Sequence, residues 1–384
     1  MSRLINALAA IHGVKVFAMK RWSYLLSLIC ALLMSPPLWA SNILFINPGK
    51  HDELYWQTAS SAMQAAARQL GFQLEVSYAE RDPLRMVEIA KLVAARAPQQ
   101  QPDVVIFSND HGLGPEMLKV FSTTKIKCFM AFSGILSADD RYLAGVPRDK
   151  YPHWLGSLVP DAHDAGYLTG KMLLAQGRKA KLYAADGKLH VLAIAGDRST
   201  PSSAQRNLGM KKAIAESADA VLDQMVYANW QQSKAMEQAS WLYERYPQAK
   251  LVWSGSDLMA FGAMQSWEAR GGVVGKTALF SAFNSSPAAM AAMQNGRLSA
   301  LAGGHALAGA WSLVLIYDYL HGKDFTEGLE MERPMFGLIT PQMAQHYQDR
   351  YGSQHFADID FKSYSKALNP ALKRYQFSLD TWLK

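Results

Sequence analysis

Three observations predict an α/β protein of two Rossmann-like lobes, each built on a parallel sheet. Short apolar runs alternate with segments of helical spacing, and the connections between them are short. The chain has 384 residues, which is more than one compact core usually holds. A loop-rich stretch, residues 133–160, interrupts the series near its middle. Strand–helix alternation on both sides of this stretch therefore predicts two lobes.

The expected strands are eight apolar runs, and the expected helices lie between them. In chain order, the runs are NILFI, QLEVSY, DVVIFS, KCFMAF, HVLAIAG, AVLDQMVY, LVWSG and ALFSAF. In residues 53–70, apolar side chains from Tyr55 to Leu70 recur at the spacing of one helix face. Further helices are expected over roughly 85–96, 162–176, 204–217, 231–245, 257–270 and 286–295. After about residue 330 the pattern loosens into a polar tail with scattered aromatic residues.

The first forty residues have the features of an export signal. A basic pair at residues 20–21 precedes the apolar run YLLSLICALLM, and SPPLWA then leads to a cleavage site between Ala40 and Ser41. The apolar run is short for a membrane span, and an uncleaved anchor is the competing interpretation. Met19, directly before the basic pair, is an alternative start to Met1. We therefore expect residues 1–40 to be removed and the protein to reach the periplasm.

Charge and cysteine content exclude several classes of function. Four of the 39 basic residues lie in the first forty positions, which hold no acidic residue. The rest of the chain is nearly neutral and has no basic stripe, so we expect no nucleic-acid partner. The cysteine beyond the signal, Cys128, stands in an apolar run and is interpreted as a buried small hydrophobe. No disulfide framework or zinc spacing is present, and we expect no metal and no cofactor.

No catalytic set is visible in the sequence. H-E-x-x-H, G-x-S-x-G and a supported Cys/His pair are all missing, so we expect no enzymatic activity. A hydrolase on a Rossmann-like fold stays open as an alternative, because catalytic triads assemble in space and not along the chain.

Six segments in the right order resemble type I periplasmic binding proteins, the group of the ribose- and galactose-binding proteins. They are INPGKHDELYWQTASSAMQAAARQLGF, DVVIFSND, AIAGDRSTPSSAQRNLGMKKAI, YANWQQSKA, VWSGSDLMAFGAMQSW and FSAFNSSPAAMAAMQNGRLSALAGGH. The resemblance covers nearly all of residues 42–330. The run GGHALAGAWSLVLIYDYLHG and the tail look closer to the autoinducer-2-binding branch and similar sensor-linked proteins.

The resemblance implies a clam-shell with three strands crossing between its lobes and a ligand trapped by hinge closure. The N-terminal lobe is then expected over 41–158 plus about 304–332, and the C-terminal lobe over 159–303. We expect the tail, 333–384, to pack mainly on the C-terminal lobe. A monomer would carry a small polar ligand, a sugar or sugar-like compound, to an inner-membrane ABC permease or a sensor kinase.

Two alternatives to solute delivery follow from the same resemblance. One is an accessory protein of a two-component or diguanylate-cyclase sensor, with a ligand that is not a sugar. The other is a sugar-responsive transcription regulator of the same fold. The regulator needs an N-terminal helix-turn-helix, and the export signal occupies that place instead.

Three aromatic residues are candidates for stacking on a sugar ring. Tyr55 and Trp56 are neighbours, so one of them must enter the core while the other faces the cleft, and we favour Trp56 for the cleft. Trp230 follows a strand and, by the resemblance, would face the ligand from the opposite lobe. Packing on its own lobe is the alternative for Trp230.

Three polar candidates lie just after strands or in the first turn of a helix. Asn109 and Asp110 end a strand of the first lobe, where ligands of α/β sheets bind, although an Asn-Asp turn is the alternative. Arg206 lies one turn into a helix and could donate paired hydrogen bonds into the cleft. A salt bridge on the helix surface would be its ordinary role.

The last three candidates come from the second lobe and its exit. Ser256 could contact ligand or simply cap the next helix. Asn284 occupies the place where sugar-binding relatives carry Asp, which weakens the sugar assignment because a charged anchor is missing. His305 follows Gly303-Gly304 at an expected lobe crossing, where it could touch ligand or serve the hinge.

Overall fold

The computed structural model describes residues 41–325 and 327–383, and the predicted signal segment lies outside them. The strands of the first lobe are β1 (Asn42–Asn47), β2 (Gln73–Tyr78), β3 (Val104–Phe107), β4 (Lys127–Ala131), β5 (Trp154–Pro160) and β11 (Glu330–Arg333). Those of the second lobe are β6 (Leu189–Ala195), β7 (Ala220–Tyr227), β8 (Leu251–Ser254), β9 (Leu279–Phe283), β10 (Ala300–Gly303) and β12 (Gly337–Leu338).

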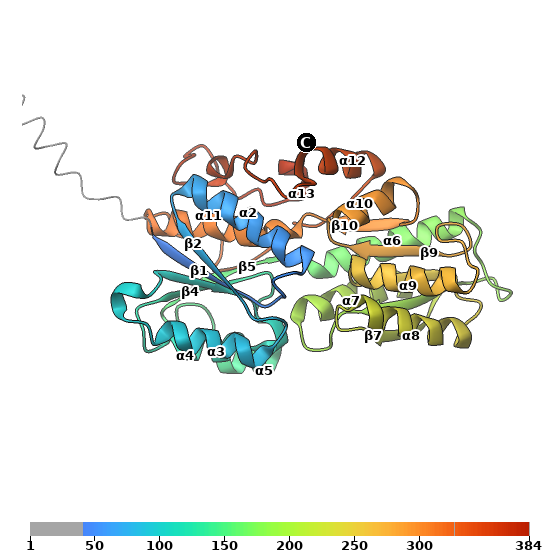
Figure 1. Cartoon of the computed structure of the whole chain (residues 1–384), viewed down its shortest axis with the longest axis horizontal. Helices are drawn as coiled ribbons and strands as arrows, with labels where there is room; N and C mark the ends of the chain where they lie inside the picture. The colour runs from blue at the N-terminus through green and yellow to red at the C-terminus, as the bar shows by residue number, and fades with distance from the viewer. Residues whose placement is uncertain (1–40, 326, 384) are drawn as a thin grey trace, which may run out of the picture. The chain divides into compact units, whose positions relative to one another are not determined.

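Each lobe contains one six-stranded sheet (Figure 1). The strand orders are β11-β5-β4-β3-β1-β2 and β12-β10-β9-β8-β6-β7. All neighbouring strands are parallel except β12, which pairs antiparallel with β10. The predicted α/β class with two parallel sheets is therefore confirmed.

Helices cover both faces of each sheet (Figure 1). In the first lobe they are α2 (Leu54–Leu70), α3 (Pro83–Ala94), α4 (Gly114–Phe121), α5 (Ala138–Ala144) and α11 (Ala308–Leu320). In the second lobe they are α6 (Ala162–Lys179), α7 (Pro201–Ala215), α8 (Gln232–Arg245), α9 (Asp257–Ala269) and α10 (Pro287–Gln294). The tail adds α12 (Pro341–Tyr351) and α13 (Leu379–Trp382).

Strand β1 shows why each sheet needs two covering layers. Its residues from Ile43 to Asn47 are all buried, because successive side chains point to opposite faces and both faces are covered. Ile43 and Phe45 belong to the core beneath α2 and α11, whereas Leu44 and Ile46 belong to the core with α3 and α4. The continuous apolar run is the sequence signature of this two-sided burial.

The stretch 133–160, expected to be loop-rich, contains the helix α5 and the strand β5. The run of β5, WLGSLVP, lacks strong apolar alternation, and it is held as a strand by its neighbours β4 and β11. Strand β11 comes from a distant part of the chain, so no local pattern could indicate this pairing. The loop-rich interpretation therefore missed α5 and β5, and β5 was missed because tertiary pairing decides it.

The chain passes between the two sheets three times within the described residues. It leaves the first lobe after β5, returns after β10 through the 3₁₀ turn His305–Leu307, and leaves again between β11 and β12. These crossings place His305 and Phe336 at the junction of the lobes.

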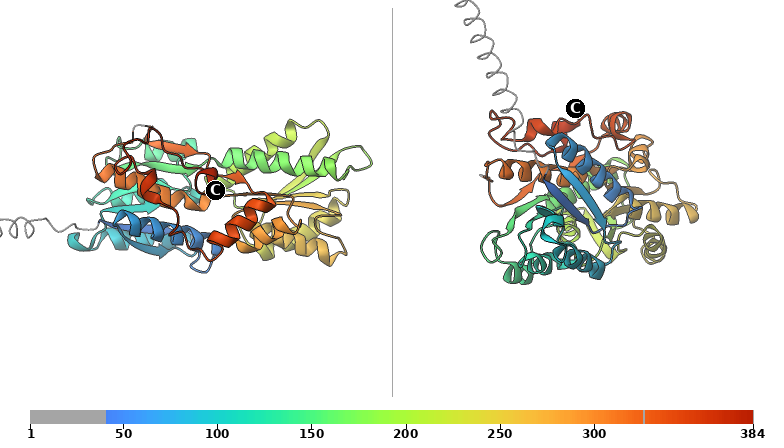
Figure 2. Two further views of the ribbon diagram at one scale, coloured as in Figure 1. Left: turned by 90° about the horizontal axis from the view of Figure 1, so that it is seen from above. Right: turned by 60° about the vertical axis from the view of Figure 1, so that its left-hand side comes forward.

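The tail lies along both lobes (Figure 2). On the second lobe, Gln348 of α12 bonds to Gln294 and to the Pro287 carbonyl at the two ends of α10. On the first lobe, the buried carboxylate of Asp318 accepts hydrogen bonds from Ser365 Oγ and Tyr375 Oη. We expected the tail to pack mainly on the second lobe, and its contacts instead divide between the two lobes.

In the described part of the chain, no helix combines the length and hydrophobicity that crossing a membrane requires. Cys128 is buried and unpaired, in line with its interpretation as a small core residue.

Candidate functional site

A cavity of about 930 Å³ lies between the lobes, where the loops after the strands of both sheets face each other. Aromatic, cationic and carboxylate side chains line it together, which is the mixture that small polar ligands require. Eight of the nine predicted site residues contribute to its lining: Tyr55, Trp56, Asp110, Arg206, Trp230, Ser256, Asn284 and His305.

Asn109 is the predicted site residue that the structure keeps out of this lining. Its side-chain amide donates to the Gly134 carbonyl at 3.0 Å and to Asp140 Oδ2 at 3.1 Å. Its carbonyl oxygen accepts from the Gly114 amide at 2.6 Å at the start of α4. The fully buried Asn109 thus holds the loop after β3, and Asp110 next to it reaches the cavity.

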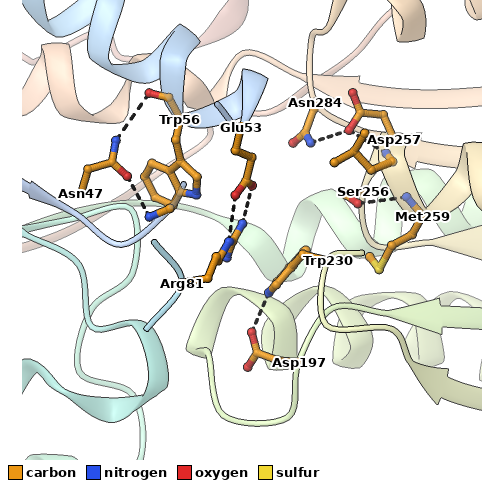
Figure 3. A network of polar contacts seen from close by, with 12 residues as sticks. Asn47, Glu53, Trp56, Arg81, Asp197, Trp230, Ser256, Asp257, Met259 and Asn284 are labelled. Atoms are coloured by element: carbon orange, nitrogen blue, oxygen red, sulfur yellow. Dashed lines mark hydrogen bonds and ion pairs between the residues drawn. The ribbon is translucent and has the colours of Figure 1, made fainter. Parts of the chain in front are cut away.

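Trp56 lies against the loop that follows β1 (Figure 3). The side chain of Asn47 fixes this loop by accepting from the Gly49 amide and by donating to Ser60 Oγ. A Cβ at Gly49 would stand 1.8 Å from the indole ring, so only glycine permits this packing. Trp56 is 4% exposed and meets Phe132 edge to face at a centroid distance of 5.1 Å.

Tyr55 is the less buried of the two neighbouring aromatic residues. Its ring stacks on His305 at 5.0 Å, and His305 stacks in turn on Phe336 at 4.1 Å. Burial raises the pKa of the Tyr55 hydroxyl, so it stays protonated and able to donate. Both aromatic residues line the cavity, with Trp56 also forming part of the core.

Trp230 lines the cavity from the second lobe and lies between β7 and α8. Its Nε1–H donates to Asp197 Oδ2 at 2.6 Å, and a Cβ at Gly196 would stand 2.2 Å from its ring. Asn229 and Trp230 both have left-handed backbone conformations, with φ of 50° and 63°. Such strain is uncommon for bulky residues and clusters at functional sites, here holding the indole at the cavity wall.

Arg206 is the buried cation of the second lobe. Its Nη1–H donates to the Gly255 carbonyl at 2.7 Å, and its Nη2–H donates to His305 Nε2 at 3.2 Å. Its Nε has no hydrogen-bond partner among the described residues, and its guanidinium lies over the ring of Phe283 at 4.7 Å. Burial lowers the pKa of Arg206 to about 10, so it remains charged at neutral pH.

Arg81 is the corresponding cation of the first lobe, and it is ion-paired. Its Nε donates to Glu53 Oε2 at 2.9 Å, and a second bond joins the same two side chains (Figure 3). The guanidinium also lies 5.8 Å from the ring of Trp230, which makes it a contact between the lobes. A hydrogen bond between His111 Nδ1 and Ser199 Oγ at 2.9 Å is a second contact between the lobes.

Two buried carboxylates face the cavity from opposite lobes. Burial raises the pKa of Asp110, although a hydrogen bond from Ser108 Oγ at 2.6 Å opposes the shift. Burial likewise raises the pKa of Asp257, which accepts from Asn284 Nδ2 at 2.8 Å. Asn284 itself has φ of 87°, a conformation that asparagine tolerates better than most residues. The side-chain amide of Asn284 is therefore engaged in a hydrogen bond to Asp257.

Ser256 both lines the cavity and caps α9, since its Oγ accepts from the Met259 amide at 3.4 Å (Figure 3). Sequence reasoning missed most of the other lining residues, among them Glu53, Arg81, Asp257 and Phe336. Arg81 and Asp257 follow strands closely, so the rule that selected Asp110 could have found them. Phe336 follows a strand that has no local signal, and only the third lobe crossing brings it to the cavity.

The described residues contain no group of acidic, histidine or cysteine side chains arranged to hold a metal.

Comparison with protein families assigns this chain to a family. A family model described as a periplasmic binding protein domain matches residues 43–324. The chain belongs to the periplasmic binding protein family. Members of this family and its structural neighbours are solute-binding proteins without enzymatic activity, so the hydrolase alternative is set aside.

Solved structures of this family are similar to the chain over most of its length. A crystal structure of a periplasmic sugar-binding protein from Pseudomonas fluorescens is 34% identical, with a TM-score of 0.80, and covers 90% of this chain and 100% of its own. A solute-binding protein of an ABC transporter from Actinobacillus succinogenes 130z, with bound D-allose, is 18% identical, with a TM-score of 0.67 over 80% of this chain and 100% of its own.

A galactofuranose-binding protein is 15% identical, with a TM-score of 0.68 over 82% of this chain and 99% of its own. At these lower identities, the likeness of the last two proteins concerns the fold alone. A comparison with curated proteins gives no match.

Proposed function

We propose that this protein is an exported binding protein whose lobes close on a sugar or sugar-like ligand. The observation that carries the proposal is the cleft itself, where Tyr55, Trp56 and Trp230 meet Asp110, Arg206 and Asp257 around one cavity. Aromatic faces cover the apolar C–H face of a sugar, while carboxylates and a guanidinium bond to its hydroxyls. The 34% identical sugar-binding protein of Pseudomonas fluorescens supports this ligand class.

The missing Asp at position 284 does not remove the charged anchor from this cleft. Asp257, which receives the Asn284 amide, supplies a carboxylate on the same lobe, and Asp110 supplies one on the other. A carboxylate accepts from two vicinal hydroxyls at once. The proposed ligand set is therefore Tyr55, Trp56, Asp110, Arg206, Trp230, Ser256, Asp257, Asn284 and His305.

Export and delivery complete the proposal. Every described helix and strand begins at residue 42 or later, so loss of residues 1–40 would remove none of them. We propose cleavage before Ser41, a monomer in the periplasm, and an inner-membrane ABC permease as the receiver of the closed form. The membrane sensor kinase is the alternative receiver. N-terminal sequencing of the periplasmic protein tests the cleavage, and cross-linking to the membrane fraction separates the two receivers.

A thermal-shift panel tests the ligand class. The panel contains D-allose, D-galactose, D-ribose and L-arabinose, each at millimolar concentration, with amino acids and dicarboxylates as the controls. A sugar that binds should raise Tm, because it stabilises the folded state by mass action. At a hundredfold excess over Kd, the free energy of unfolding increases by about 2.7 kcal/mol. Mass spectrometry of the protein taken from the periplasm under native conditions extends the panel to co-purifying compounds. Binding confined to compounds that are not carbohydrates would contradict the proposal.

A further inference from the structure

The ring of His305 connects three parts of the molecule at the end of the cavity. It stacks on Tyr55 from α2 and on Phe336 from the third lobe crossing, and it is 2% exposed. Its Nε2 faces Arg206, which belongs to α7 of the second lobe. Since His305 itself begins the return of the chain into the first lobe, this contact lies where the lobes join.

The direction of the hydrogen bond between Arg206 and His305 follows from chemistry. A guanidinium has only donors, so Arg206 Nη2–H donates and His305 Nε2 accepts with its lone pair. The imidazole is therefore neutral and carries its proton on Nδ1. Burial and the charge of Arg206 both lower the pKa of His305 well below its ordinary value, which agrees with this assignment.

Arg206 needs such a partner because its long side chain has no ion pair among the described residues. The Gly255 carbonyl holds one terminal nitrogen, and His305 holds the other from a different element. Two acceptors on separate elements fix the plane of the guanidinium. The remaining N–H groups, including the unpartnered Nε, are then left for a ligand.

We propose that His305 is a positioning residue, whose Nε2 holds the Arg206 guanidinium in the orientation in which it meets the sugar. The inference rests on the proposed function, because it assigns how a residue of that same site is oriented. The stack of His305 between Tyr55 and Phe336 fixes the imidazole plane, and the imidazole fixes the guanidinium. Ligand affinity is thereby tied to the geometry of the hinge crossing.

Two substitutions separate the acceptor of His305 from its ring. His305→Gln retains an acceptor at about the reach of Nε2 and loses the ring, whereas His305→Phe retains the stack and loses the acceptor. With the panel sugar that raises Tm most as the probe, isothermal titration should show affinity within a few-fold of wild type for His305→Gln. His305→Phe should lose roughly tenfold or more, because a hydrogen bond to a charged group is lost.

The stability of the ligand-free variants supplies the control. A merely structural role of the stack predicts the reverse order, with His305→Phe nearly normal in affinity and His305→Gln impaired. Equal losses in both variants, or an unimpaired His305→Phe, would overturn the proposal. Denaturant titration of each variant shows whether a loss of affinity reflects unfolding.

A measurement without sugar keeps this inference distinct from the proposed function. In ¹⁵N NMR of the purified protein, the His305 Nε2 should show the unprotonated form at every pH from about 5.5 to about 8, and its resonance should shift in Arg206→Lys. The titratable groups that face His305 are Arg206 from α7 and Tyr55 from α2, and neither changes charge in this range. Titration of His305 near its ordinary pKa of about 6.5, or a resonance that ignores Arg206→Lys, would overturn the positioning role even if sugars bind. A panel without any binding sugar would instead contradict the proposed function and leave this readout intact.

Discussion

The two faces of the cleft are built on one plan and differ in how their cations are balanced. In each lobe an indole ring lies over a glycine that follows the lobe's first strand, Trp56 over Gly49 and Trp230 over Gly196. In the first lobe, however, Arg81 is ion-paired with Glu53, whereas Arg206 of the second lobe has only neutral acceptors. The difference teaches that the Arg81 cation of the first lobe is satisfied within the protein, while the Arg206 cation of the second lobe is kept for a partner.

The largest expected effect is on stability and concerns Trp56, whose indole both lines the cavity and packs in the core. Trp56→Ala should lower the free energy of unfolding by about 3–5 kcal/mol, because the ring is almost fully buried between Phe45 and Phe132. Trp230→Ala should cost less stability, since its ring is only partly buried. Urea denaturation of the two ligand-free variants measures both values. Equal losses would erase this part of the comparison and show that Trp230 is as much a core residue as Trp56.

The two cations should differ most clearly in ligand affinity. Arg206→Leu should weaken binding of the panel sugar roughly a hundredfold, because bonds to a buried charge are worth about 1.5–3 kcal/mol each. Arg81→Leu should weaken binding by about tenfold or less and should act chiefly on stability, since it leaves Glu53 without its partner. Isothermal titration and thermal denaturation of both variants give the comparison. A larger affinity loss for Arg81→Leu would reverse the roles of the lobes.

The smallest expected effect concerns the carboxylate of the second lobe. Asn284→Asp should cost about 2 kcal/mol of stability at about pH 8, because it replaces a donor to Asp257 with a second carboxylate. The cost should shrink as the pH falls, since the pKa of Asp257 is already raised by burial and the new neighbour raises it further. In terms of linkage, the folded variant binds the extra proton, so its stability is lost as the pH rises through that raised pKa.

The reciprocal exchange Asn284→Asp with Asp257→Asn is the matched control for this position. It restores one amide and one carboxylate in contact, so most of the lost stability should return at about pH 8. Thermal melts of the single variants and the double variant at about pH 5 and about pH 8 decide the matter. A single Asn284→Asp variant that is insensitive to pH would show that the two side chains do not share one charge.

Local pattern was sufficient for most strands and helices of this fold. The eight apolar runs correspond to β1–β4 and β6–β9. The central strands are continuously apolar because they are buried on both faces, whereas the edge strands β2 and β7 are half-buried and carry polar residues. The same reasoning did not predict the strands β5, β10, β11 and β12. Three of them are short, and β5 gains its place only by pairing with β11 from far along the chain. Long-range pairing leaves no trace in a local pattern.

The candidate site shows the same division. Position after a strand was enough to bring Asp110 into the list, because parallel strands deliver their carboxyl ends to one edge, whereas the family resemblance added Trp230 and Asn284. The same rule selected Asn109, which the tertiary structure turns away to bond with Gly134 and Asp140. Asn109 and Asp110 are neighbours in the sequence, yet the backbone directs their side chains to different places.

The sequence by itself determined the α/β class, the two lobes and the edge of each sheet at which polar residues gather, because apolar periodicity and strand ends are local properties. Only the tertiary structure decided how the charges are balanced. Glu53 meets Arg81 across 28 positions, and Arg206 meets His305 across 99. Whether a buried charge is neutralised depends on what folding brings within hydrogen-bond distance, and the lobe crossings, not the local sequence, set those distances.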